Sequence, residues 1–117
     1  MNERRTPSIS THVLDTERGL PAAGVPVTIA RWEGDRLVLL REAITDADGR
    51  IADLLGARLT YGGYRLTFDI GVYFRELDGD MPFFTTVTLD IEITDDERHY
   101  HIPLLASRFA CTSYRGS

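Results

Sequence analysis

The sequence contains no lysine, a single cysteine and no long apolar run, and each shortage excludes a class of protein. All thirteen basic residues are arginine, which excludes a Schiff-base lysine and the lysine of a phosphate-binding P-loop. The lone Cys111 cannot form an intrachain disulfide, so a secreted disulfide scaffold is not expected. Apolar runs of about five residues are too short to span a membrane, and residues 1–8 lack the apolar core of a signal peptide. We therefore expect a cytoplasmic protein.

The charge and composition are those of one acidic globular domain. The 117 residues carry a net charge of −5, with 43% hydrophobic and 26% charged residues. A chain of this length suits a single domain, which we expect to span residues 1–117. An acidic chain offers no basic surface to nucleic acid or to an anionic membrane, so neither is an expected partner.

Alternating apolar and polar residues predict a protein made mainly of β-strands. The pattern is clearest at residues 8–15 and 84–94, and the second of these has an apolar residue at every other position from 87 to 93. Further strands are predicted at 25–32, 37–44, 64–70 and 99–105. One short helix is predicted at 71–77, and a turn follows it. About eight short strands separated by turns indicate an antiparallel β-sandwich with one short helix.

The same alternation places all three histidines on outer faces of strands. In the first strand Ile9 and Val13 are expected to face the core, which leaves His12 and Leu14 outside. In the last block the expected outward residues are His99, His101, Pro103 and Leu105. Apolar residues on an outer sheet face indicate that another surface covers it, and the simplest cover is a second copy of the chain.

Three histidines on a covered face allow more than one chemistry. The His-x-His pair at 99–101, together with His12, has the ligand types of a zinc site with an open position for water. The same imidazoles can instead act as a general base and bind a substrate, because imidazole titrates near neutral pH. They can also be surface residues without a catalytic role.

Other polar motifs are weaker candidates. Residues 46–50 contain Asp-x-Asp-Gly, but the twelfth position of a calcium loop would be Ala57 here, so a plain turn is predicted. Cys111 is expected to be a small buried side chain and not a nucleophile. The serines that lack the flanking glycines of a nucleophile elbow include Ser10, Ser107 and Ser113. Composition and spacing alone leave a hydrolase and a binding module both open.

Four blocks of sequence, taken together and in order, carry a family resemblance. They are Ser-Thr-His-Val-Leu-Asp at 10–15, Thr-Asp-Ala-Asp-Gly-Arg at 45–50, His-Tyr-His-Ile-Pro-Leu-Leu at 99–105 and Tyr-Arg-Gly-Ser at 114–117. They resemble the 5-hydroxyisourate hydrolases, the transthyretin-related enzymes of purine breakdown, over almost the whole chain. Two positions depart from the family pattern: Arg108 stands where a proline is usual, and Cys111 where an aromatic residue is common.

The resemblance implies a fold, an assembly and a reaction. The fold would be a transthyretin-like sandwich of two four-stranded sheets with a short helix. The assembly would be a homotetramer, a dimer of dimers, with active sites in the channel between dimers. The reaction would be ring-opening hydrolysis of 5-hydroxyisourate, the product of urate oxidation, to 2-oxo-4-hydroxy-4-carboxy-5-ureidoimidazoline on the route to allantoin. Neither a cofactor nor a metal ion is expected.

The resemblance also implies the site residues. The family's catalytic set corresponds to His12, Arg50 and His101. The expected substrate-binding residues are His99, Tyr114, Arg115, Gly116 and Ser117, of which Ser117 would reach the site. His101, together with His12, is expected to activate water and move protons, while Arg50 binds the oxygens of the substrate. The alternative is a transthyretin-like carrier of a small ligand, which would need an apolar channel in place of these polar side chains.

Overall fold

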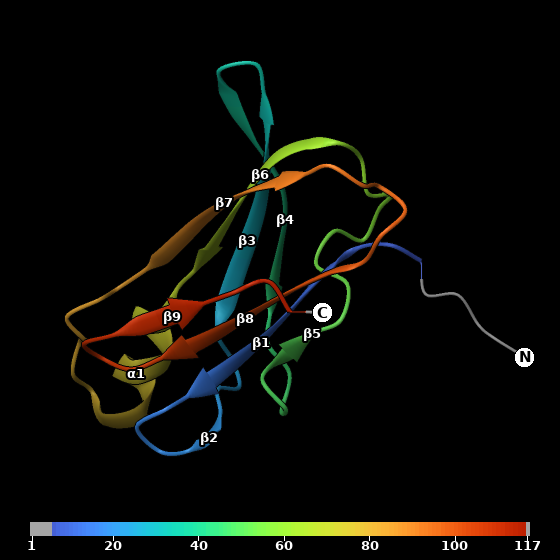
Figure 1. Ribbon diagram of the computed structural model, residues 1–117. Helices are drawn as coiled ribbons and strands as arrows, with labels where there is room; N and C mark the ends of the chain where they lie inside the picture. Colours follow the sequence, from blue (N-terminus) through green and yellow to red (C-terminus); the bar gives the residue numbers. More distant parts are fainter. Residues whose placement is uncertain (1–5, 117) are drawn as a thin grey trace, which may run out of the picture.

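The structure is a computed structural model that describes residues 6–116, and it consists of two packed β-sheets with one helix beside them (Figure 1). The first sheet has the strand order β2-β1-β8-β9, with β5 also paired to β1. Its strands are β1 (Ile9–Asp15), β2 (Leu20–Pro21), β5 (Arg50–Ile51), β8 (Tyr100–Ala106) and β9 (Cys111–Ser113). The second sheet has the order β4-β3-β6-β7. Its strands are β3 (Pro26–Glu33), β4 (Arg36–Ile44), β6 (Gly62–Phe68) and β7 (Val87–Ile93). The predicted all-β, two-sheet sandwich is confirmed.

The central pair of the first sheet contradicts the expectation of an antiparallel sandwich. Strands β1 and β8 run parallel along their whole length, from Ile9 opposite Tyr100 to Asp15 opposite Ala106. The Thr11 hydroxyl strengthens the pair by donating to the Ile102 carbonyl at 2.6 Å. Parallel and antiparallel strands share the same two-residue alternation, so the sequence pattern could not tell them apart. The short β5 also gives this sheet a fifth strand where four were expected.

Strand β7 begins later than the sequence pattern predicted. It starts at Val87, which lies opposite Phe68, the last residue of β6, so no neighbouring strand remains for residues 84–86. The backbone there bonds elsewhere: Phe84 N–H donates to the Arg108 carbonyl at 3.2 Å, and the Thr85 carbonyl accepts from Gly71 at 2.8 Å. The expected alternation is present within β7 itself, with Ile93 buried and Val87 half-buried.

The core lies between the two sheets and is closed at one end by α1 (Ile70–Asp78). The helix begins where the Asp69 carboxylate accepts from Val72 N–H at 3.2 Å, and it ends at Gly79, whose φ of 87° favours glycine. The largest side chains buried between the sheets and the helix are Tyr64, Phe68, Phe74, Ile9, Ile29, Leu54, Leu59 and Leu66. Within residues 6–116 no helix combines the length and the apolar character needed to cross a membrane.

Arg108 joins three parts of the fold. Its guanidinium forms ion pairs with Glu17, in the loop after β1, and with Asp78 at the end of α1. The same group lies 4.6 Å from the centroid of the Phe74 ring. A cation over an aromatic face is attracted by the ring quadrupole. Arg108 therefore adds contacts between the β8–β9 turn and the helix.

Tyr73 makes the stability of the fold depend on pH in the alkaline range. Its hydroxyl donates to Asp15 Oδ2 at 2.8 Å, and burial together with this carboxylate raises the pKa of Tyr73 to about 12. A phenol in the unfolded chain ionises near pH 10, so the stabilisation is complete below about pH 10 and is lost as the pH rises to about 12. We expect Tyr73→Phe to lower the free energy of unfolding by about 1–2 kcal/mol at pH 7, and this difference to shrink above about pH 10. Urea titrations of both proteins across that range measure it, and a difference that stays constant would contradict the linkage.

Candidate active site

The outer face of the first sheet carries His12 and His101 on the neighbouring strands β1 and β8. Buried and half-buried residues alternate as predicted, with Val13 and Ile102 buried, and His12 and His101 half-buried. The outer face also carries Leu14 opposite Leu105. Both leucines are half-buried and not fully exposed, and Pro103, expected outside, is buried. The parallel register places Ser10 opposite His101.

Arg50 reaches this face because a tight turn delivers β5 to the other edge of β1. The turn predicted at residues 46–50 is present, and Asp46 Oδ1 closes it by accepting the backbone N–H of Asp48 and of Arg50, each at 2.9 Å. Gly49 completes the turn with a φ of 75°, and a side chain there would collide with the Val13 carbonyl. The turn leaves Arg50 paired with His12 in the β1–β5 register.

Ser10 links the two other histidines in one hydrogen-bonded chain. Ser8 N–H donates to Nδ1 of His99 at 3.2 Å. Nε2 of His99 lies 2.9 Å from Ser10 Oγ, and Ser10 Oγ lies 2.8 Å from Nδ1 of His101. The Ser8 hydroxyl bonds to the Asp53 carboxylate, which holds the pKa of Asp53 below its ordinary value. The imidazoles therefore occupy fixed positions relative to β1.

A cavity of about 270 Å³ opens beside these residues and brings Arg50 together with two of the histidines. Its lining residues are Ser10, Thr11, Arg50, Ile51, Ala52, His99 and His101. The Arg50 side chain is exposed, and across residues 6–116 no group accepts a hydrogen bond from its guanidinium. A cation beside two imidazoles can bind carbonyl or anionic oxygens of a small planar molecule and move protons.

The C-terminal segment returns to His101, although not all of its residues do. Figure 1 shows the chain leaving β9 and running back beside β8, where Gly116 N–H donates to the His101 carbonyl at 2.7 Å. Gly116 also packs against the His101 ring, since an added Cβ would lie 2.9 Å from Cδ2. Ser117, expected to reach the site, lies outside the described residues.

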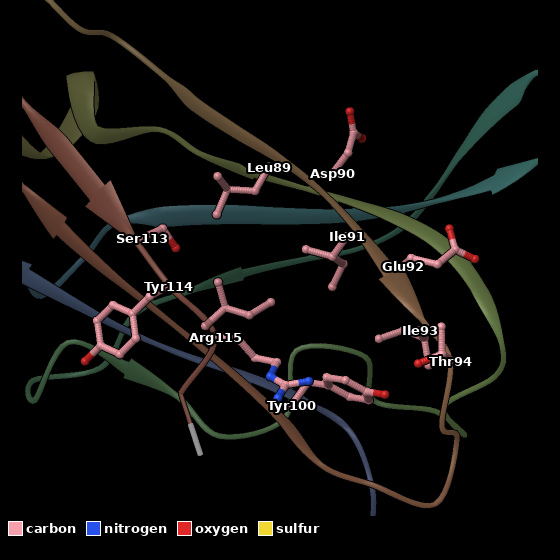
Figure 2. Close-up of a pocket in the computed structure, with 11 residues that line it drawn as sticks. Leu89, Asp90, Ile91, Glu92, Ile93, Thr94, Tyr100, Ser113, Tyr114 and Arg115 are labelled. Carbon is pink, nitrogen blue, oxygen red and sulfur yellow. The ribbon is translucent and has the colours of Figure 1, made fainter.

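Tyr114 and Arg115 line a different cavity, of about 290 Å³, at the open edge between the sheets. Figure 2 shows that Leu89 and Ile91 point from β7 toward this gap, whereas Asp90 points away. Within one chain Tyr114 and Arg115 therefore border the gap between β7 and β9 and do not line the histidine cavity, so their expected role in substrate binding stays a prediction.

The structure gives less support to a zinc site and to a cysteine nucleophile. Across residues 6–116 no three or more His, Cys, Asp or Glu side chains gather closely enough to hold a metal ion. Cys111 is half-buried in β9, and burial raises the pKa of its thiol above the ordinary value. A thiol with a raised pKa forms little of the nucleophilic thiolate at neutral pH.

Ser10 is the residue that the sequence interpretation missed. Its lack of flanking glycines argues against a nucleophile, yet its position two residues before His12 puts it on the same outer face of β1. That alternation could have identified it as a neighbour of the histidines. Thr11, Ile51 and Ala52 carried no comparable signal, because they line the cavity through the pairing of β5 with β1.

Comparisons with known proteins show the family of this chain. The family model described as "HIUase/Transthyretin family" matches residues 9–116. A 5-hydroxyisourate hydrolase of Caulobacter vibrioides is 42% identical, over 93% of this chain and 97% of its own. The solved structure of Klebsiella pneumoniae 5-hydroxyisourate hydrolase superposes with a TM-score of 0.84 at 38% identity, covering 95% of this chain and 99% of that one. Transthyretin from Sparus aurata superposes with a TM-score of 0.87 at 27% identity, over 96% and 97% of the two chains. The chain therefore belongs to the HIUase/transthyretin family.

Proposed function

We propose that the protein hydrolyses 5-hydroxyisourate, opening its cyclic amide to give 2-oxo-4-hydroxy-4-carboxy-5-ureidoimidazoline. Relatives that carry the name 5-hydroxyisourate hydrolase match nearly the whole chain at 36–44% identity. The observation in the fold that carries the proposal is the cavity lined by Arg50, His99 and His101. This cavity supplies a cation and imidazoles to a planar, oxygen-rich substrate.

The reaction asks three things of the site, and the proposal assigns each to residues. The oxygen of a water molecule attacks the carbonyl carbon, the carbonyl oxygen gains negative charge, and the ring nitrogen leaves with a proton. Arg50 binds the oxygens through its planar guanidinium. His12 and His101 divide the proton transfer and the stabilisation of charge between them. His99 and Gly116 hold His101 in place, and Ser117 is assigned to substrate binding.

A transthyretin-like carrier of a small apolar ligand is the weaker candidate. The fold suits both functions, since the TM-score to Sparus aurata transthyretin, 0.87, is similar to the TM-score to the Klebsiella enzyme, 0.84. The outer face of the first sheet, however, presents His12, Arg50 and His101 beside Ser10. Desolvating these polar groups against an apolar ligand would cost free energy, whereas a polar substrate would pair with them.

The proposal includes a homotetramer that works in the cytoplasm. Strands β7 and β9 are each the last strand of a sheet, and unpaired strand edges readily bind another strand. The gap between them is bordered by the half-buried Leu89 and Ile91. These features support pairing of two copies along this edge. The half-buried Leu14 and Leu105 support a second contact over the outer face that carries the histidines.

An assay on freshly generated 5-hydroxyisourate tests the function. Because this substrate decays by itself, each measurement is paired with an enzyme-free control. We expect ring opening to be at least tenfold faster with the protein present. Native mass spectrometry of the same preparation should give the mass of four chains of 13.2 kDa. A decay rate unchanged by the protein would reject the hydrolase, and a purely monomeric protein would reject the assembly.

A further inference from the structure

A chain of hydrogen bonds joins Ser8, His99, Ser10 and His101, and its first bond determines which group donates in each of the others. A backbone N–H can only donate, so Nδ1 of His99, 3.2 Å from Ser8 N, is an acceptor and carries no hydrogen. The single ring hydrogen of neutral His99 is therefore on Nε2, which lies 2.9 Å from Ser10 Oγ. This N–H donates to the Ser10 hydroxyl oxygen.

Ser10 donates the next hydrogen bond, to His101. Its hydroxyl has one hydrogen, and its Oγ has two partners in the described part of the chain, Nε2 of His99 and Nδ1 of His101. Because the first partner already donates to Ser10, the hydroxyl hydrogen goes to Nδ1 of His101, 2.8 Å away. Ser10 is only 6% exposed, so solvent competes little for this hydrogen. Neutral His101 must then carry its own hydrogen on Nε2.

Ser8, the first residue of this chain of hydrogen bonds, is itself held in place by several contacts. The Ser8 carbonyl accepts from Tyr100 N–H at 2.9 Å, and the Ser8 hydroxyl bonds to Asp53. The Asp53 carboxylate also accepts from Gly56 N–H at 2.9 Å. Ser8 is 4% exposed. These contacts keep its N–H directed at His99, so the tautomer of His99 follows from the backbone of the fold.

We infer that Ser10 is a positioning residue that holds neutral His101 in the tautomer with hydrogen on Nε2, so that His101 donates a hydrogen bond in the reaction and does not act as the base. The reaction itself rests on the proposed function. With Nδ1 accepting from Ser10 and Nε2 carrying hydrogen, neutral His101 has no lone pair left to take a proton from water. Its N–H can stabilise the negative charge that develops on the carbonyl oxygen, together with Arg50.

His101, expected from the sequence to activate water together with His12, then donates a hydrogen bond instead. The base is then His12, which lies on the same outer face and pairs with Arg50 in the register. His12 takes the proton as the water oxygen bonds to the carbonyl carbon. The same proton moves to the ring nitrogen as the carbon–nitrogen bond breaks, which returns His12 to its neutral form. The atoms balance without a further reactant.

Three variants test the role of Ser10. Ser10→Ala removes the hydroxyl, Ser10→Thr keeps a hydroxyl, and Ser113→Ala is the matched control. The control deletes a hydroxyl that donates to β8 at the Pro103 carbonyl at 2.7 Å, away from the imidazoles. The tautomer is read from the nitrogen-15 chemical shifts of the imidazoles in histidine-labelled protein, at a pH where they are neutral. Kinetic measurements on 5-hydroxyisourate give kcat and KM separately.

We expect His101 to carry hydrogen on Nε2 in the parent protein, in Ser10→Thr and in Ser113→Ala, and to be a mixture of tautomers in Ser10→Ala. Loss of one hydrogen bond corresponds to about a tenfold fall in kcat for Ser10→Ala, with KM little changed. A parent His101 with hydrogen on Nδ1, or an unchanged tautomer in Ser10→Ala, would overturn the inference. The spectra require no substrate, so they decide the role of Ser10 even if the protein fails to hydrolyse 5-hydroxyisourate.

Discussion

Replacing Arg50 by lysine is expected to lower kcat for ring opening by about 10²–10³-fold, the usual effect of removing one donor to a developing oxyanion. Lysine keeps the positive charge but loses the planar fork that can bind two oxygens at once. The fold should not change, because the Arg50 side chain is exposed and donates no hydrogen bond to another group of residues 6–116. Steady-state kinetics on 5-hydroxyisourate measure the effect.

The matched control for this substitution is Arg36→Lys. Arg36 is also exposed, but it lies at the start of β4 in the β3–β4 hairpin of the other sheet. We expect both variants to unfold within about 0.5 kcal/mol of the parent protein, as exposed substitutions usually do. Only Arg50→Lys should lose activity. Equal kinetics for the two variants would mean that Arg50 does not bind the reacting oxygens.

The strand content could be read from the sequence because the core imposes an alternation that each strand displays by itself. Residues such as Ile9 and Val13 in β1, or Leu66 in β6, are buried where the pattern places them. The direction of strand pairing could not be read, since β1 and β8 are about ninety residues apart and alternation is the same in both directions. The two-residue β5 is too short to produce any periodic signal.

In the candidate site, too, some features follow from the sequence of a single strand and others depend on the pairing of distant strands. The outward positions of His12 and His101 follow from alternation within their own strands. The family resemblance implied that Arg50 belongs with these histidines. Their meeting depends on the pairing of β5 with β1, which the local pattern did not predict. Ser10 became visible as a partner of two histidines only with the register of β1 against β8, because that register places it opposite His101.

Changes at the C-terminal end are expected to produce the second large loss of activity. In Gly116→Ala the new Cβ would lie 2.9 Å from Cδ2 of His101 and 3.3 Å from its carbonyl oxygen, so the ring or the tail must move. Displacing a catalytic group by about 1 Å can cost about 10²-fold in rate, and we expect a fall in kcat of this order. A peptide appended after Ser117 should also lower the activity, whereas the same peptide placed before Met1 should not.

Gly63→Ala provides the control for the glycine substitution. Its Cβ would meet Trp32 Cδ1 at 3.4 Å, an ordinary contact in β6 of the other sheet, so this variant should keep the parent kcat. Circular dichroism and thermal unfolding of both variants separate a local effect at His101 from a loss of fold. If Gly116→Ala turns over substrate at the parent rate, the tail does not support His101. If peptides at the two ends of the chain act alike, the C-terminus lies outside the site and the substrate is bound by Arg50 and the histidines without it.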